Sequence, residues 1–195
     1  MGEARLRLFV GLGNPVPTYG GTRHNIGSMT LDRFASAKGL HFEYSPLGGG
    51  SEIARDPLGR IFMKPLTYMN HSGYPVIALL RSQEILPGQV LIILDDYAIP
   101  LGKLRIRKGG GAGGHNGLAS ILCCLSTEAI PRLRIGIGGG AASSATDSRL
   151  AEYVLGVFSK EERPTVNRVV AHACDAIEML QSSEIDAVMN QFNQH

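Results

Sequence analysis

Cysteines and long apolar runs are scarce in this sequence, and both absences limit the kind of protein it encodes. Three cysteines occur in 195 residues, so the chain is unlike a disulfide-stapled secreted domain and we expect a reducing compartment. No apolar run approaches the roughly eighteen residues that span a bilayer, and Met1–Arg7 is too charged for a signal peptide. A hydrophobic fraction of 44% and a charged fraction of 18% are typical of a globular protein. We therefore expect a soluble cytoplasmic protein that does not contact a membrane.

Several familiar catalytic motifs are also missing. The sequence has no G-x-S-x-G nucleophile turn, no H-E-x-x-H zinc helix and no P-loop lysine after its glycine clusters. Gly109–Gly114 does match G-x-G-x-x-G, but it lies in mid-chain, and only Glu128 stands near the position of the acid that would hold a ribose. His115, near Cys123 and Cys124, lacks further ligands at a standard metal-binding spacing. We therefore predict neither a nicotinamide cofactor nor a metal site.

Strand and helix patterns alternate along the chain and predict a single α/β domain over residues 1–195. Its architecture would be a mixed, twisted β-sheet flanked by helices, with further helices in the C-terminal part. Val90–Leu94 is apolar throughout and predicts a central strand buried on both faces, and Asp56–Gly59 predicts a hairpin turn. The other predicted strands cover 6–10, 40–44, 51–55, 60–64, 103–108 and 132–137, and the predicted helices cover 26–38, 72–82, 118–125 and 184–192.

One further helix is predicted between residues 159 and 180, and its start stays open. Ser159-x-x-Glu162 has the form of a capping box, whereas Pro164 suits a first helical turn. Gly138–Ser148, which precedes it, is small and polar and predicts a loop.

Positive charge is concentrated in one segment, although the whole chain carries a net charge of only +2. Residues 103–134 contain six basic side chains and one acid, a local charge of +5 that leaves −3 for the rest. In Lys103–Lys108 the basic residues alternate with Leu104 and Ile106, as they do on the solvated side of an edge strand. The same strand leads into Gly109–Gly117, whose backbone amides at a helix start suit phosphate oxygens. Both interpretations stay open: a solvated edge, or a face that binds a nucleic-acid backbone.

Phe9–Asn25 is the stretch that most suggests chemistry. It leaves a predicted strand through Gly11 and Gly13 and carries His24 to a predicted helix start. Asp95 follows the central strand, and strand ends in an α/β sheet form the ligand crevice. A carboxylate that accepts from one imidazole nitrogen lets the other take a proton from water, which predicts hydrolysis by water attack. The spacing does not show whether His24 contacts Asp95, so a solvated loop histidine and an unrelated acid stay an alternative.

Four segments resemble bacterial-type peptidyl-tRNA hydrolases and occur in that family's order. They are FVGLGNPxxxYxxTRHNIG (Phe9–Gly27), KPLTYMNHSG (Lys64–Gly73), ILDDYAIPLGKLRIRKGGGAGGHNGLASI (Ile93–Ile121) and PRLRIGIG (Pro131–Gly138). The resemblance implies cleavage of the ester that joins a peptide to the 3′ end of tRNA, which returns the tRNA to translation. It also implies a monomer that needs no cofactor and whose partner is peptidyl-tRNA.

The resemblance implies a role for each matching position. His24 would be the general base that activates water, Asp95 would orient and polarise His24, and Asn14 would hold the substrate carbonyl and help to distinguish blocked from free aminoacyl groups. Side chains that hold the peptide-ester end and the tRNA terminus would be Asn70, Asn116, Tyr19 and Tyr68. Side chains that grip tRNA phosphate would be Arg107 and Lys108, with Arg132 or Arg134.

One position departs from the family pattern, and two other functions compete with the hydrolase. Val16 stands where the family usually has glycine, and a β-branched residue adopts positive φ poorly, so either the loop differs or the position does not need that conformation. A non-catalytic RNA-binding relative, of the kind that helps splice organellar introns, is the first alternative; loss of His24 or Asp95 would favour it, and both are present. A nicotinamide-dependent oxidoreductase is a more distant one. A mature organellar enzyme is the alternative to a cytoplasmic one.

Overall fold

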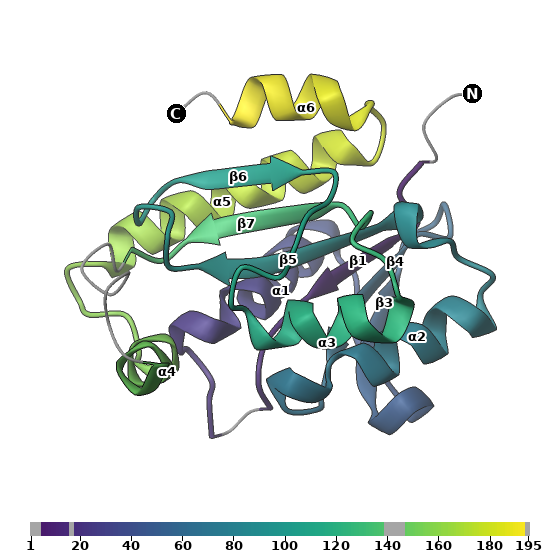
Figure 1. The fold of residues 1–195 in the computed structure, drawn as a ribbon. Helices are drawn as coiled ribbons and strands as arrows, with labels where there is room; N and C mark the ends of the chain where they lie inside the picture. The colour runs from purple at the N-terminus through teal and green to yellow at the C-terminus, as the bar shows by residue number, and fades with distance from the viewer. Residues whose placement is uncertain (1–4, 16–17, 139–146, 194–195) are drawn as a thin grey trace.

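A twisted seven-stranded sheet runs through the part of the chain that the computed structural model describes, residues 5–15, 18–138 and 147–193. The strands follow the order β2-β3-β4-β1-β5-β7-β6 across the sheet (Figure 1). Their bounds are β1 Leu8–Gly11, β2 Glu43–Ser45, β3 Ser51–Arg55, β4 Ile61–Pro65, β5 Val90–Asp96, β6 Leu104–Arg107 and β7 Arg132–Gly136. The helices are α1 Ile26–Lys38, α2 Gly73–Ser82, α3 Asn116–Leu125, α4 Asp147–Leu155, α5 Arg163–Leu180 and α6 Ile185–Phe192. Short 3₁₀ helices are η1 Arg23–Asn25, η2 Leu47–Gly49, η3 Met69–His71 and η4 Pro87–Gln89.

The sheet is mixed, as predicted. Its centre is parallel, since β1 pairs with β4 and β5, and β5 pairs with β7. Both margins are antiparallel, because β3 pairs with β2 and β4 on one side and β6 pairs with β7 on the other. The carboxyl ends of β1, β5 and β7 therefore meet at one edge of the sheet, where an α/β fold places its ligands.

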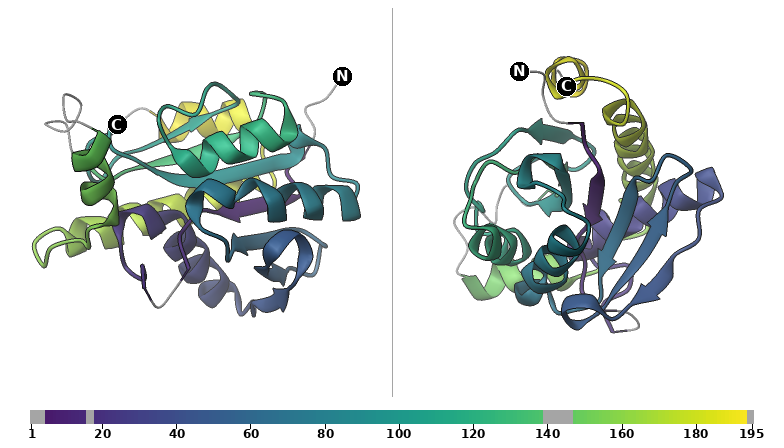
Figure 2. Two further views of the ribbon diagram at one scale, coloured as in Figure 1. Left: turned by 60° about the horizontal axis from the view of Figure 1, so that its bottom comes forward. Right: turned by 90° about the vertical axis from the view of Figure 1, so that its right-hand side faces the viewer.

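Helices cover both faces of the sheet, and each face has its own apolar core. Phe9, Leu91 and Ile93 point to one face and pack with α1 and α5, whereas Leu8, Val10 and Ile92 point to the other and pack with α2 and α3. The alternation follows from the period-two geometry of a strand. Figure 2 shows the two helical layers on either side of the strands. A strand buried on both faces has to be apolar throughout, which is why β5 reads VLIIL before its two aspartates.

Most predicted elements are present with small shifts in their bounds. The predicted helix over 26–38 is confirmed as α1, and Gly39 ends it with φ of 64°, a left-handed conformation that glycine adopts readily. The hairpin around Asp56–Gly59 is confirmed, and the central strand extends to Asp96. The strand expected over 40–44 lies at Glu43–Ser45 instead.

Two helix starts differ from expectation. Ser72 precedes α2 but does not cap it, because its hydroxyl donates to the carbonyl of Met69 in the preceding η3 turn at 2.8 Å. At α5, both sequence signals are real: Pro164 lies in the first turn, and Ser159 and Glu162 exchange hydrogen bonds in the turn just before it.

Helix α4 was not predicted. The sequence suggested a loop over Gly138–Ser148, yet α4 begins at Asp147. Most of the expected loop, residues 139–146, lies outside the described part of the chain, as does Val16.

The edge strand β6 is covered by α6. The side-chain amide of Asn193 accepts from the backbone N–H of Ile106 at 2.7 Å and donates to its carbonyl at 3.0 Å. Lys108 and Asp186 form an ion pair of 2.6 Å between the end of β6 and the first turn of α6. Among the described helices, none has the combined length and hydropathy that a membrane span requires.

Candidate active site

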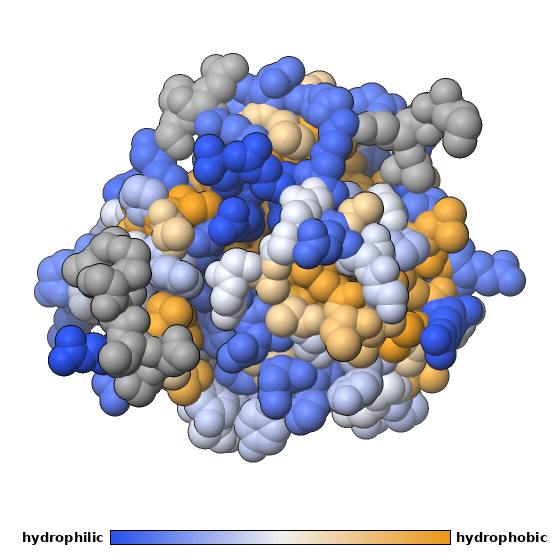
Figure 3. All heavy atoms as spheres, in the orientation of Figure 1, coloured by the Kyte–Doolittle hydropathy of each residue, from blue (hydrophilic) through white to orange (hydrophobic). Residues whose placement is uncertain are grey.

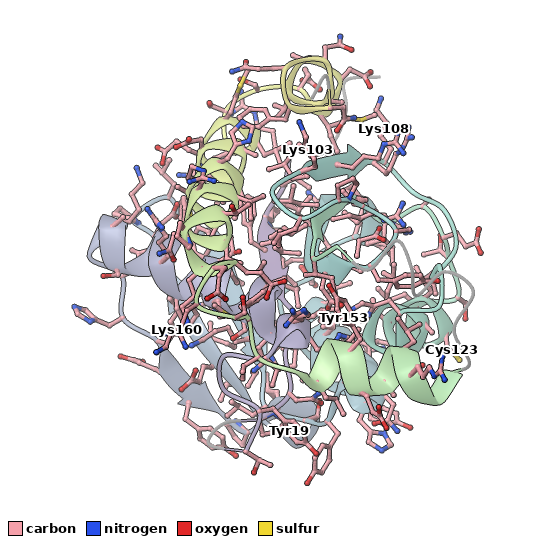
Figure 4. The ribbon with its side chains drawn as sticks, turned by 90° about the vertical axis from the view of Figure 1, so that its left-hand side faces the viewer. Tyr19, Lys103, Lys108, Cys123, Tyr153 and Lys160 are labelled. Atoms are coloured by element: carbon pink, nitrogen blue, oxygen red, sulfur yellow. The ribbon has the colours of Figure 1, made fainter. Side chains whose placement is uncertain are left out.

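A cavity of about 840 Å³ opens at the carboxyl ends of β1 and β5. Figure 4 looks onto this edge of the molecule, with Tyr153 near the centre of the view and Tyr19 below it. Helix α4 contributes Leu150, Val154 and other apolar side chains to one wall. The predicted site residues that line the cavity are His24, Asp95, Asn14, Tyr19, Tyr68, Asn70, Asn116 and Arg134. Residues separated by more than one hundred positions in the sequence, such as Asn14 and Asn116, thus share one surface.

His24 and Asp95 are in direct contact. His24 Nδ1 lies 2.7 Å from Asp95 Oδ1, and both residues are buried. The contact depends on a close approach of α1 to the sheet, since a Cβ at Gly27 would lie 2.2 Å from the carbonyl oxygen of Ile93. Only glycine at this position lets the segment before α1 bring His24 to the end of β5.

The Asp95 carboxyl is buried and yet favours its ionised form. Burial alone raises its pKa, but the electrostatic interactions and hydrogen bonds of the carboxyl with His115 and His24 outweigh burial and hold the pKa well below its usual value. Asp95 is therefore a carboxylate at neutral pH, positioned to stabilise a proton on His24.

His115 is a member of this site that the sequence analysis did not identify. Its Nε2 lies 3.0 Å from the same Asp95 Oδ1, and its ring centroid lies 4.7 Å from that of His24. Its Nδ1 accepts from the backbone N–H of Leu118 at 3.1 Å, which makes His115 the N-cap of α3. The sequence does offer one indication of this role: His115 lies immediately before an apolar helix, where a side chain that caps the helix is expected.

Asn14 is held rigidly by its surroundings. Its Oδ1 accepts from the backbone N–H of Met69 at 2.8 Å. The side chain of Asn25 braces its backbone, accepting from Asn14 N at 2.8 Å and donating to Asn14 O at 2.9 Å. Because Oδ1 is used, the Nδ2 donors of Asn14 are left for a ligand, and they have no hydrogen-bond partner among the described residues.

The other predicted ligand contacts lie around the rim. Asn70 belongs to η3 and Asn116 is the first residue of α3, and both are exposed. Tyr68, just before η3, is 61% exposed, so most of its ring is open to a ligand. The polar rim and aromatic surface can present amide donors, amide acceptors and a stacking face to a substrate.

Arg23 anchors the loop that carries His24. Its guanidinium donates to both carboxylate oxygens of Glu162 at 2.9 and 2.8 Å and to the carbonyl of Val157 at 2.5 Å. It also stacks over the ring of Tyr153, 4.6 Å from the centroid. Arg23 therefore joins η1 to the connection between α4 and α5.

The predicted phosphate-binding residues divide into different environments. Arg107 is exposed on β6, outside the cavity, and Lys108 is paired with Asp186. Arg132 is only 2% exposed and donates to the carbonyls of Gly110 and Gly111 at 2.5 and 3.1 Å, so it holds the glycine segment rather than facing solvent. Of the pair Arg132 or Arg134, the structure leaves Arg134 accessible: it lines the cavity and forms an ion pair with Asp96.

Gly110 and Gly111 are not arranged as a phosphate cradle, and both histidines form hydrogen bonds with Asp95. Gly110 and Gly111 turn their carbonyls toward Arg132, whereas a phosphate cradle needs backbone N–H groups. His24, Asp95 and His115 bring three possible ligand atoms together. In this structure both imidazoles form hydrogen bonds with the same carboxylate oxygen, at 2.7 and 3.0 Å.

The comparisons with known proteins agree with this geometry. The model of the family described as peptidyl-tRNA hydrolase matches residues 8–195. A protein from Parasynechococcus marenigrum (strain WH8102) named peptidyl-tRNA hydrolase is 46% identical over 194 residues, covering 96% of this chain and 94% of its own. One of the same name from Dehalococcoides mccartyi (strain BAV1) is 39% identical and covers 96% of this chain and 100% of its own.

A solved structure shares the fold. The crystal structure of peptidyl-tRNA hydrolase from Acinetobacter baumannii superimposes with a TM-score of 0.88 at 31% identity, covering 97% of this chain and 95% of that one. Sequence identity and fold therefore agree over nearly the whole chain. This chain belongs to the bacterial-type peptidyl-tRNA hydrolase family.

Proposed function

We propose that the protein hydrolyses the ester bond between the peptide and the tRNA of peptidyl-tRNA, releasing free tRNA for translation. The observation that carries the proposal is the buried contact of 2.7 Å between His24 Nδ1 and Asp95 Oδ1 at the floor of the cavity. Loss of His24 or Asp95 would favour the non-catalytic RNA-binding alternative, but both residues are present and in contact.

The proposed reaction begins with His24 as general base. Its Nδ1–H donates to Asp95, so Nε2 carries a lone pair and takes a proton from water. The resulting hydroxide attacks the ester carbonyl, the ester C–O bond breaks, and the 3′ oxygen of the tRNA leaves with the proton from His24. The negative charge of Asp95 stabilises the imidazolium while it exists.

Asn14 would hold the carbonyl region of the substrate. Its oxygen is already bound to Met69 N, so its Nδ2 offers fixed donors to an oxygen that gains negative charge. A fixed donor also provides a way to select the peptide amide over a free, cationic α-amine. Asn70 and Asn116 would position the peptide-ester end, and Tyr19 and Tyr68 would line the place of the terminal nucleotide.

The tRNA backbone would follow the basic face of β6 and β7. In the antiparallel register Arg105 lies opposite Arg134 and Arg107 lies opposite Arg132, so these four side chains share one face. Figure 3 shows strongly hydrophilic side chains gathered over these strands. Since Arg132 is buried, we propose Arg134, Arg105 and Arg107 as successive phosphate contacts leading away from the cavity. Lys108 would join them only by giving up part of its interaction with Asp186.

We further propose that the enzyme acts in the cytoplasm as a monomer of one domain over residues 1–195, with no metal or cofactor. A histidine and a carboxylate suffice for the proton transfers described. The bacterial relatives and the few, unpaired cysteines support a reducing compartment.

The deciding experiment compares two substrates that differ only in the α-amino group. The protein should deacylate an N-acetylated aminoacyl-tRNA and spare the same tRNA carrying a free aminoacyl group. Equal rates on both, or no reaction with either, would remove the proposal. His24→Ala should abolish turnover and leave tRNA binding nearly intact, whereas the exposed His41→Ala serves as the matched control and should turn over normally.

A further inference from the structure

His115 uses its two ring nitrogens for two different bonds. Nδ1 accepts from the Leu118 N–H at the start of α3, and Nε2 lies 3.0 Å from the carboxylate of Asp95. Only 9% of the residue is exposed, so neither bond is readily exchanged for one with water. The imidazole therefore connects a helix terminus to the catalytic carboxylate.

The backbone of α3 determines where the His115 proton lies. A nitrogen that accepts from a backbone N–H carries no proton itself, so Nδ1 is unprotonated and the ring hydrogen is on Nε2. Nε2–H then donates to Asp95 Oδ1, the oxygen that also accepts from His24 Nδ1. Protonating Nδ1 would place a positive charge against the N–H groups at a helix N-terminus, which is unfavourable.

We infer that His115 is a positioning residue that sets how strongly Asp95 draws a proton onto His24. A carboxylate oxygen that accepts from two donors interacts less strongly with each of them than it would with one alone. Without the His115 donor, Oδ1 would interact with His24 alone, and His24 would hold its proton more tightly in the resting enzyme. The inference rests on the proposed function, because it concerns the base of that reaction.

Other charged groups near the pair do not provide the same effect. The titratable or charged side chains that line the cavity besides the three partners are Tyr19, Tyr68, Asp96, Tyr97 and Arg134. Asp96 is paired with Arg134, and Arg23, next to His24 in the chain, is paired with Glu162. Asp95 is the one carboxylate that bonds to His24 in the described part of the protein, so its second donor matters directly.

Two substitutions separate the two bonds of His115. In His115→Asn the amide oxygen lies near the place of Nδ1 and can still cap α3, but the side chain is too short to reach Asp95. In His115→Gln the amide nitrogen can reach Asp95, but the cap is lost. The rate of deacylation of N-acetylated aminoacyl-tRNA, measured as kcat/KM from pH 5 to 9, distinguishes them.

We expect the pH profile to shift only in His115→Asn, the variant that loses the hydrogen-bond donor to Asp95. The acid limb of the His115→Asn profile should move to higher pH by about half a unit or more, about a threefold loss of rate at low pH. His115→Gln should keep the wild-type acid limb and lose thermal stability instead. An unshifted His115→Asn profile, or equal shifts in both variants, would overturn the inference.

A second measurement does not depend on turnover. Long-range ¹⁵N–¹H spectra of the imidazoles in the wild-type protein should show His115 as the Nε2–H tautomer at neutral pH. Finding the Nδ1–H tautomer would also overturn the inference. If wild type fails to deacylate the blocked substrate while His115 shows the expected tautomer, the proposed function fails and the local geometry stands.

Discussion

Replacing Asp95 by asparagine removes one charge from the site and leaves the side-chain shape unchanged. When His24 takes a proton from water, its positive charge lies about 4 Å from the Asp95 carboxylate, given the 2.7 Å between the bonded atoms. At an effective dielectric constant of about 20 this attraction amounts to about 4 kcal/mol. Because 1.36 kcal/mol corresponds to a factor of ten, kcat should fall about a thousandfold. Burial of Asp95 keeps salt from screening the effect.

The assay is single-turnover deacylation of N-acetylated aminoacyl-tRNA at pH 7.5, with tRNA affinity measured separately. Affinity should change little, because Asp95 lies beneath His24 and not at the rim. Asp175→Asn, on the exposed side of α5, is the matched control and should retain the wild-type rate. A loss of less than tenfold in Asp95→Asn would refute the electrostatic reasoning and leave His24 to act without its carboxylate.

The same variant carries a prediction about stability. The pKa of Asp95 is lower in the folded protein than its ordinary value of 3.8, so its ionisation stabilises the fold above about pH 4 and this contribution declines as the pH falls. Urea unfolding should therefore show a difference between wild type and Asp95→Asn that is largest near neutral pH and narrows below pH 4. A difference that does not depend on pH would show that the carboxylate charge contributes nothing to folding.

Three further predictions concern other parts of the molecule. Arg107→Ala should weaken tRNA binding and reduce the slope of log affinity against log salt by about one, since one phosphate contact is lost. Thiol labelling at pH 8 should reach the exposed Cys123 first and Cys174 last, because burial raises the pKa of Cys174 to about 11. Gly27→Ala should lower stability by about 3 kcal/mol, a fall in Tm of roughly 10 °C, because the new methyl group meets the Ile93 carbonyl.

Each of these has a control and a contrary outcome. Arg168→Ala, on the exposed side of α5, should leave the salt slope unchanged. If Arg107→Ala also keeps the wild-type slope, Arg107 makes no phosphate contact and β6 is an ordinary solvated edge strand. Gly88→Ala adds a methyl group in open space and should be nearly neutral, so similar melting of the two glycine variants would contradict the close-approach argument. Labelling of Cys174 as fast as Cys123 would mean that α5 opens readily from the sheet.

The elements that sequence predicted well are those whose signal is local. The bounds of α1 follow from its apolar spacing and from Gly39, which tolerates the left-handed conformation at the helix end. Strand β5 follows from an apolar run that only a doubly covered strand can bury. Helix α4 has no such signal, because its stability depends on packing over the cavity and beside η1 rather than on a strong period of its own.

The contacts of the site could be predicted only in part, since they depend on how distant segments meet. His24 and Asp95 are 71 positions apart, and their contact requires the parallel register of β1 and β5. Arg132 and Arg134 share a face of β7 by alternation, yet only the folded glycine segment shows that the first is enclosed and the second is open. The double use of His115 depends on the exact start of α3, which sequence patterns locate only to within a few residues.

The contact between Asn193 and Ile106 has a consequence for solubility. An edge strand offers unpaired N–H and C=O groups to any extended chain that approaches it, and such edges are common starting points for aggregation. At the middle of β6 one side-chain amide already occupies both groups of Ile106, in the place where a neighbouring strand would bond. At the opposite edge, β2 is only three residues long and offers little to pair with. The Asn193 side chain thus pairs the backbone groups of Ile106 that a neighbouring strand would otherwise bond. This protection of the edge does not cover the basic face of β6, which stays charged and exposed.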